Sequence, residues 1–236
     1  RRGTSRTPRC ARAPQAALAD RPAIVRLLPK ETLVYASVAN TKELVQRFQE
    51  TGFGQMLQEP QIKPLFQQLY GNLRSEMAGL EERLGVTLDE MLALPSGAMA
   101  VAVIKPEEGP VSLVGFIEVQ DQYVTAKKLL DRLDMELATR GVEFAEEQVG
   151  ETRITYYQFR RQQLAYFDRD GVLVLGSNMG VLKDLLTTWD GGKKECLADN
   201  RSFATVQSKC RGDADDPPQM FWYADRLGLV RALVPA

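Results

Sequence analysis

Between Gln163 and Trp189, hydrophobic residues first form two short blocks and then recur every three or four positions. The blocks are Gln163–Phe167 and Val172–Leu175. Asp170-Gly171 between them is typical of a tight hairpin turn, because glycine tolerates a positive φ. The later spacing is helical, and its hydrophobic side consists of Val181, Leu182, Leu185 and Leu186. The segment therefore predicts a strand, a turn, a second strand and an amphipathic helix.

The same strand-to-helix step occurs near the start of the chain. Leu33–Val38 is a hydrophobic block, and Asn40 with Glu43 three residues later resembles a helix-capping pair. We expect the following helix to end at Gly52 and Gly54. Its expected buried side consists of Leu44, Val45 and Phe48.

A third step begins at Met220–Ala224 and continues as a helix from Asp225. The three segments predict a repeated strand-to-helix unit. We therefore expect residues 1–22 to be a disordered basic tail or signal remnant and residues 23–212 to form one α+β domain. Residues 213–236 would be a linker and the truncated start of a second α+β unit, in a chain that is a fragment of a longer protein.

Four further strands are predicted at Ala98–Ile104, Val111–Val119, Val142–Val149 and Thr152–Phe159. The last two form a hairpin, and the strands of the opening segment extend it into a four-strand antiparallel meander. In the first of the four, alanines alternate with larger side chains, so we expect a second layer to pack closely against the alanine side. The larger side chains are Met99, Val101 and Val103.

Helices are predicted from Pro64 to Leu84, from Thr87 to Pro95, from Asp121 to Gly141 and from Arg201 to Lys209. The first has one hydrophobic stripe, which either packs on the sheet or forms an exposed zipper seam. That stripe consists of Phe66, Leu69, Leu73, Met77, Leu80 and Leu84. The predicted fold class is α+β, with an antiparallel meander packed against amphipathic helices.

Composition narrows the functional classes. The 236 residues include no histidine, which excludes Ser-His and Cys-His catalytic pairs and histidine metal ligands. The net charge of −1 and a pI near 5.8 argue against nucleic-acid binding and against anionic membranes. No hydrophobic run reaches the roughly 20 residues of a membrane span. The sequence thus favours a non-enzyme that has no cofactor.

The first twenty residues are rich in arginine and contain no acidic residue before Asp20. Such a segment cannot form a core, so we expect it to be disordered. Residues 16–20, AALAD, resemble the end of a secretory signal cleaved after Ala19, although the hydrophobic segment of a signal is missing. A transit peptide is the alternative. We expect an extracytoplasmic location, either periplasmic or secreted.

The cysteines suggest one cross-link. In an oxidising compartment Cys196 and Cys210 could form a disulfide that closes a short loop. Bridging needs Cα atoms within about 7 Å, so residues 196–199 would have to run back along the following helix. Three cysteines without CxxC spacing and without histidine make a zinc site unfavourable.

One loop could hold an anion. Gly176, Ser177, Asn178 and Gly180 precede and begin a predicted helix, where free N–H groups can bind a negative charge. The alternative is an ordinary N-cap formed by Ser177 or Asn178. The known glycine-rich phosphate-binding patterns are absent, which favours the N-cap.

The other candidates have simple structural interpretations. Asp213, Asp215 and Asp216 do not match a calcium-binding loop and indicate a solvated turn. Glu146 and Glu147 are adjacent on a strand and point to opposite faces, which makes them a poor acid/base pair. Glu81-Glu82 and Glu107-Glu108 fall on a helix surface and a turn. The aromatic residues predict core packing or an aromatic ligand groove; they are Tyr156, Tyr157, Tyr166, Phe167, Trp189, Phe221, Trp222 and Tyr223.

Four motifs resemble a known family: LLPKETLVYASVAN, LGVTLDEMLALPSGAMAVAV, DRDGVLVLGSN before a helix, and CLADNRSF. Together they are similar to the bacterial domain-of-unknown-function family numbered thirty-three fifty-two, over residues 27–236. The resemblance implies an exported α+β protein, often longer than this chain, with no assigned activity and no catalytic residues.

We therefore expect a non-catalytic extracytoplasmic module that binds a partner protein or a cell-surface polymer, or that has a structural role. The first alternative is a carrier of a small apolar or lipid ligand held between sheet and helices, which requires an enclosed cavity. The second is a carboxylate-dependent hydrolase, which requires two acids in one cleft with at least one raised pKa.

Overall fold

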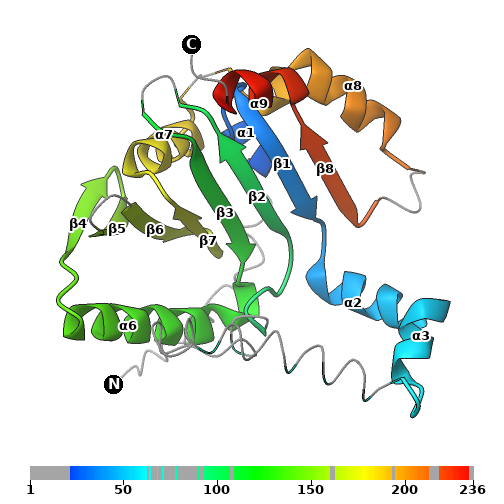
Figure 1. Ribbon diagram of the computed structural model, residues 1–236. Helices are drawn as coiled ribbons and strands as arrows, with labels where there is room; N and C mark the ends of the chain where they lie inside the picture. The colour runs from blue at the N-terminus through cyan, green and yellow to red at the C-terminus, as the bar shows by residue number, and fades with distance from the viewer. Residues whose placement is uncertain are drawn as a thin grey trace, which may run out of the picture.

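The computed structural model describes residues 22–62, 93–106, 109–159, 163–192, 195–212 and 218–233, with a few single positions between 64 and 90. Its centre is one eight-stranded sheet in the order β4-β5-β6-β7-β3-β2-β1-β8, and every neighbouring pair is antiparallel (Figure 1). The strands are β1 Thr32–Val38, β2 Met99–Ile104, β3 Ser112–Glu118, β4 Phe144–Val149, β5 Thr152–Gln158, β6 Gln163–Arg169, β7 Val172–Gly176 and β8 Met220–Ala224.

Helices surround this sheet, which confirms the predicted α+β class. The α-helices are α1 Ile24–Leu27, α2 Thr41–Glu50, α3 Gly52–Gln58, α6 Tyr123–Thr139, α7 Met179–Trp189, α8 Arg201–Lys209 and α9 Arg226–Leu233. Short 3-10 turns are η2 Gln120–Gln122 and η3 Leu197–Asp199. In the part of the chain that the structure describes, no helix combines the length and the hydrophobicity that a membrane crossing requires.

The predicted hairpin and helix at residues 163–189 are confirmed. Asp170 and Gly171 have φ values of 51° and 74°, so both turn residues occupy the left-handed region that a two-residue hairpin requires. Asn178 then caps α7 by accepting hydrogen bonds from the backbone N–H groups of Gly180 and Val181. Local sequence therefore decided both the turn and the start of the helix.

One side of the sheet, which we call the closed face, is covered by α1, η3, α7 and α8. Here Phe203 of α8 is completely buried, and its ring makes edge-to-face contacts with Tyr35 and Tyr223. Phe167 packs in the same way against Trp189 of α7. These aromatic contacts join helices to strands and form the main core.

The alanines of β2 face this core, as their small size predicts. Ala102 is fully buried, and Ala100 is 7 % exposed. A methyl side chain lets the covering helices approach the sheet closely, so the predicted second layer on the alanine side is confirmed. Val101, between the two alanines, points to the opposite side and is 41 % exposed.

On the opposite side of the sheet, the helices that the structure describes cover only one end. There α6 packs over β5, β6 and β7, and its Ala126 and Leu137 lie in a second hydrophobic cluster with Tyr157, Tyr166 and Leu173. Figure 1 shows α6 running across this end of the sheet, away from β1 and β8.

The predicted helix at Leu44–Phe48 is present, but its predicted burial is wrong. No residue of α2 is buried; Val45 is 55 % exposed and Phe48 packs instead on Phe53 of α3. Thr51 caps α3, so Gly54 lies inside that second helix. A Cβ on Gly54 would come within 2.0 Å of the Phe48 carbonyl oxygen, so glycine is needed there for close packing.

The last strand joins the first domain's sheet. β8 pairs antiparallel with β1 from Val34↔Ala224 to Val38↔Met220. α9 follows it, and Gly228 of α9 lies so close to β1 that a Cβ there would be 2.7 Å from Leu33 Cδ2. β8 and α9 are therefore integral to the sheet that the sequence assigned to residues 23–212, and the expected boundary at 212 does not separate two sheets here.

Several predictions fall outside the described residues. They are the tail at 1–20 with Cys10, the hydrophobic stripe of the 64–84 helix, the 87–95 helix apart from single positions, the pairs Glu81-Glu82 and Glu107-Glu108, and the acidic loop with Asp213, Asp215 and Asp216. These stay predictions.

Candidate functional site

The N-terminus of α7, the predicted anion loop, is occupied by the protein's own side chains. Asn178 Oδ1 accepts from the N–H groups of Gly180 (2.8 Å) and Val181 (3.4 Å). Gln163 Oε1 accepts from Met179 N at 3.2 Å. All three N–H groups of the first turn are thus satisfied internally, which favours the N-cap interpretation over an anion site.

Gly176 and Ser177 have structural roles in the same loop. Ser177 Oγ accepts a hydrogen bond from Leu113 N at 2.9 Å, which ties the loop to β3. Gly176 is buried, and a Cβ there would approach the Leu182 side chain to 3.0 Å. The four residues of the predicted loop therefore lie together, but their polar groups face the protein.

The predicted disulfide is absent, since Cys196 and Cys210 are both free thiols. Cys196 precedes η3, and Cys210 follows α8, so a helix of nine residues separates them. At about 1.5 Å per residue this helix is roughly 13 Å long, well beyond the reach of a disulfide. Cys196 Sγ instead donates to Asp199 Oδ2 at 3.1 Å, and burial raises the pKa of the Cys196 thiol.

A surface groove of about 840 Å³ lies between α1, α7 and the end of β2. Its lining combines hydrophobic residues such as Leu28 and Val181 with charged residues at the rim. One rim residue, Lys183, forms an ion pair with Glu147 at 2.6 Å, and another, Glu195, pairs with Lys30 at 2.9 Å. The groove is open at the surface, whereas a ligand carrier needs an enclosed cavity.

One carboxylate lies in an unusual environment. Asp134 of α6 accepts hydrogen bonds from Tyr157 and from Tyr166, the latter at 3.2 Å. Burial raises the pKa of Asp134, although the Tyr166 hydroxyl opposes this shift, and burial also raises the pKa of Tyr166. Both oxygens of Asp134 are thus engaged with tyrosines, which favours a role in fixing α6 to the sheet.

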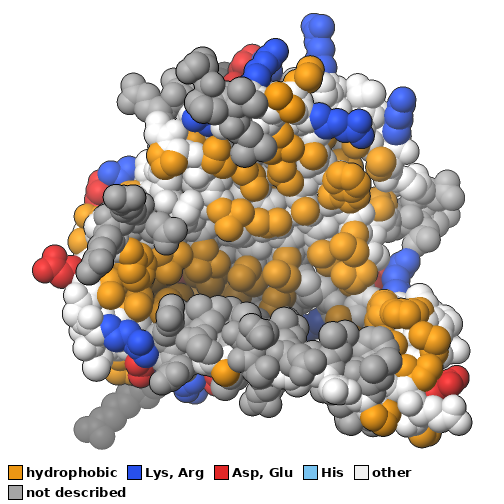
Figure 2. Space-filling view, viewed as in Figure 1, with side chains coloured by type: hydrophobic (Ala, Val, Ile, Leu, Met, Phe, Trp, Pro, Cys, Tyr) orange, Lys and Arg blue, Asp and Glu red, His pale blue; other side chains and the backbone are white. Residues whose placement is uncertain are grey.

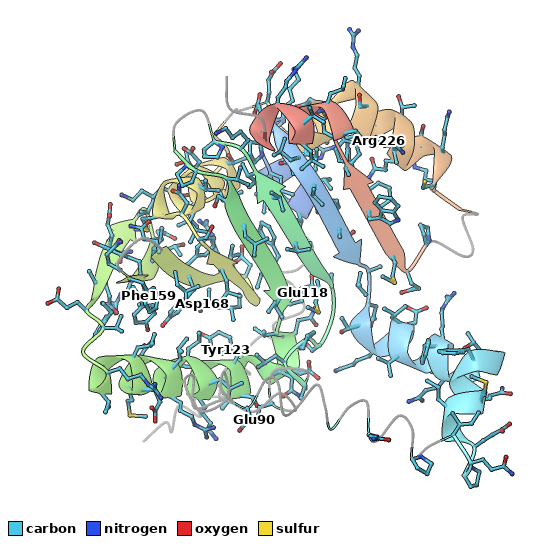
Figure 3. All side chains as sticks on the ribbon, in the orientation of Figure 1. Glu90, Glu118, Tyr123, Phe159, Asp168 and Arg226 are labelled. Carbon is cyan, nitrogen blue, oxygen red and sulfur yellow. The ribbon has the colours of Figure 1, made fainter. Side chains whose placement is uncertain are left out.

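The carboxylates of Asp131 and Glu146 also contribute to the raised pKa of Asp134. Three acids near this end have partners of their own. Glu146 forms an ion pair with Arg153 at 3.2 Å, whereas Glu147 pairs with Lys183 of α7. Tyr123 donates to Asp168 at 2.8 Å, and Figure 3 shows these two residues between α6 and β6. The 840 Å³ groove is lined by three acids, Glu31, Asp184 and Glu195, of which Glu195 is held in the ion pair with Lys30. A carboxylate-dependent hydrolase therefore stays a prediction.

Glu118 is a buried acid that the sequence reasoning missed. It is 7 % exposed at the end of β3, and its Oε2 accepts from Ala98 N at 2.8 Å (Figure 3). A Cβ on Gly97 would lie 2.2 Å from that oxygen, so glycine leaves room for the carboxylate. Glu118 thereby closes the β2–β3 end of the sheet, and the signal for it was a glutamate inside a hydrophobic block.

A further unusual surface is the half of the sheet over which no helix of the described residues packs, which we call the open face; at its margin Ile117 also contacts the cluster under α6. Strand pairing places its residues in three rows across β8, β1, β2 and β3. The rows are Met220, Val38, Met99 and Ile117; Trp222, Ala36, Val101 and Gly115; and Ala224, Val34, Val103 and Leu113. Every position in these rows is hydrophobic or glycine.

Exposure confirms that this face is accessible. Trp222 is 73 % exposed, Met220 62 % and Leu113 54 %. Figure 2 shows hydrophobic side chains across the middle of this side, with Lys, Arg, Asp and Glu at its margins. The predicted aromatic groove does not form as a unit, because Tyr157, Phe167 and several other members are buried on different sides of the sheet.

A second groove, of about 640 Å³, lies beside β8. It is lined by Ser202 and Val206 of α8, by Cys210 directly after that helix, by all of β8, and by Asp225, Arg226 and Leu227 at the start of α9. Met220 and Trp222 belong both to this groove and to the open face. The two features are therefore continuous.

Comparison with known proteins adds no further constraint. No protein-family model matches the chain, and neither the curated proteins nor the solved structures contain a significant match. The resemblance to family thirty-three fifty-two stays a prediction.

Proposed function

We propose that this chain is a non-catalytic, extracytoplasmic binding module whose open face docks onto an apolar surface of a partner protein. The observation that carries the proposal is the set of three rows across four strands, in which every position is hydrophobic or glycine and Leu113 and Trp222 are mostly exposed. Large contiguous hydrophobic patches on soluble proteins mark interaction sites.

The chemistry of the open face favours a protein over other partners. A polysaccharide needs polar groups for its hydroxyls, and the side chains of the three rows supply only the indole N–H of Trp222. An anionic membrane needs a basic field, whereas the chain has a net charge of −1. An apolar protein surface matches a flat, uncharged sheet.

The proposal can be tested with charge substitutions at matched exposure. Leu113→Lys places a charge within the open face, and Met135→Lys places one on α6, where the native side chain is 64 % exposed. Both variants should retain the thermal stability of the parent, because exposed substitutions change it by about 0.5 kcal/mol or less. Leu113→Lys should weaken partner binding at least tenfold, and Met135→Lys should leave it unchanged.

Partners would be captured from the extracytoplasmic fraction of the source organism and purified. Each would then be titrated against the parent chain, Leu113→Lys and Met135→Lys. A photoreactive residue at position 101 should crosslink to the purified partner. The proposal is overturned if the partner binds Leu113→Lys as tightly as the parent, if crosslinks form elsewhere only, or if the parent chain captures nothing.

A further inference from the structure

The two edges of the sheet differ in their chemistry. β4 carries Glu146 and Glu147, both held in ion pairs, and charges on an edge strand discourage pairing with another strand. β8 at the other edge has the sequence Met-Phe-Trp-Tyr-Ala, without any charge. An edge strand of this kind is a ready template for a further strand.

The hydrogen-bond register shows which backbone groups of β8 are available. Ala39 N donates to Gln219 O at 2.8 Å, and Asp225 N donates to Leu33 O at 2.7 Å. Since these groups alternate along an antiparallel strand, residues 219, 221, 223 and 225 face β1. The N–H and C=O groups of Met220, Trp222 and Ala224 therefore point away from the sheet, and no described strand pairs with them.

The groove beside β8 leaves space for a chain along these groups. Its walls are α8 on the closed-face side and the start of α9, and Figure 1 shows both helices next to β8. A strand placed there would direct alternate side chains toward Val206 of α8 and toward Trp222 on the open face. Because α8 and the start of α9 form its walls, the groove suits a single extended strand better than a helix.

We propose that β8 receives an extended, mostly apolar segment of a partner protein, which adds a strand to the sheet. Only a polypeptide presents N–H and C=O groups at the spacing that Met220, Trp222 and Ala224 require. This proposal goes beyond the open-face function, because it rests on backbone groups rather than on the hydrophobic rows.

A second copy of the chain fits this edge less well. Two antiparallel β8 strands related by a two-fold axis would keep both closed faces on the same side, so the α8 helices of both copies would have to share the space beside the joined strands. A single extended segment avoids that conflict.

The start of α9 indicates one charged residue in the bound segment. The Asp225 carboxylate is already engaged, because it accepts hydrogen bonds from the N–H groups of Leu227 and Gly228, whereas the Arg226 side chain is exposed. An acidic residue at one end of the segment would lie beside Arg226, which lines the groove.

The test uses a displayed library of random heptapeptides, followed by titration of the selected synthetic peptides. Ala224→Pro removes one outward N–H and leaves the bonds to β1 intact, since Ala224 does not donate toward β1. Peptide affinity should fall at least tenfold in Ala224→Pro and change less than threefold in the control Ala224→Val. Arg226→Glu should weaken the acid-bearing peptides, and Leu113→Lys should not affect any of them, which separates this site from the open face.

If Ala224→Pro unfolds, N-methylated peptides replace it. Methylation of the amides that face β8 should abolish binding, and methylation of the alternate amides should not. The proposal is overturned if no peptide is enriched, if methylation at either set has the same effect, or if the amides of Met220, Trp222 and Ala224 are already protected from hydrogen exchange in the protein alone. A dimer that is lost in Ala224→Pro would assign the edge to a second copy and overturn the partner segment.

Discussion

Val101 and Ala102 are neighbours in β2, yet one is 41 % exposed and the other is fully buried. Ala102 lies on the closed face, where α1, α7 and α8 complete a core, and Val101 lies on the open face. Both sides of this strand are hydrophobic in sequence. The difference shows that a hydrophobic pattern favours burial of a surface but does not specify what buries it. The fold decides whether helices of the same chain cover that surface.

The largest expected difference between the faces is in how much stability is lost when an aromatic side chain is replaced by alanine. Phe203→Ala on the closed face should lower the free energy of unfolding by about 3–5 kcal/mol, because it leaves a cavity beside Tyr35 and Tyr223. Trp222→Ala on the open face should cost about 1 kcal/mol or less, since Trp222 is mostly exposed. Urea denaturation measures both. Equal losses would contradict the distinction between the two faces.

A smaller contrast compares enlargement at adjacent positions. Ala102→Leu should lower the free energy of unfolding by about 1–3 kcal/mol, because the closed face has no space for a larger side chain. Val101→Leu should change it by about 0.5 kcal/mol or less. Thermal denaturation of the two variants provides the comparison. A Val101→Leu loss as large as that of Ala102→Leu would mean that the open face is packed.

The smallest expected effect is on the pH dependence of the free energy of unfolding, and it comes from Asp134 at the end of the sheet that α6 covers. Burial raises the pKa of Asp134, so the folded state binds its proton more tightly than the unfolded chain. The stabilising contribution is complete below the unfolded pKa of about 3.9 and is lost as the pH rises through the folded pKa. In Asp134→Asn, the part of the decline in the free energy of unfolding with rising pH that comes from Asp134 should disappear.

The measurement is the free energy of unfolding at several pH values upward from about 3. Glu151→Gln in the β4–β5 turn, at an exposed position, controls for removal of a negative charge. A decline of the same size in Asp134→Asn and in the parent chain would show that Asp134 is not its source.

Several parts of the fold could be predicted because they depend on neighbours in sequence. Asp170-Gly171 forms the expected turn, Asn178 and Asn40 cap their helices, and the alanines of β2 face a close layer. Each of these depends on backbone conformation or side-chain size within a few residues.

The candidate sites were less accessible to prediction. The separation of Cys196 from Cys210 depends on how η3 and α8 follow one another, and the occupied N–H groups of α7 depend on Gln163 from a different strand. Similarly, the hydrophobic stripe of α2 predicted burial, but the stripe does not specify a partner. Each of these outcomes depends on contacts between distant segments.

The sequence alone determined the strands, the turns, the helix caps and the hydrophobic side of most helices, because these follow from residue spacing and local hydrogen bonding. The tertiary structure alone decided that β8 pairs with β1, that the described helices cover one face and only part of the other, and that the backbone groups of Met220, Trp222 and Ala224 point outward. Strand order and helix placement arise from long-range packing, in which a hydrophobic surface has the same pattern whether it is buried within the chain or left for a partner.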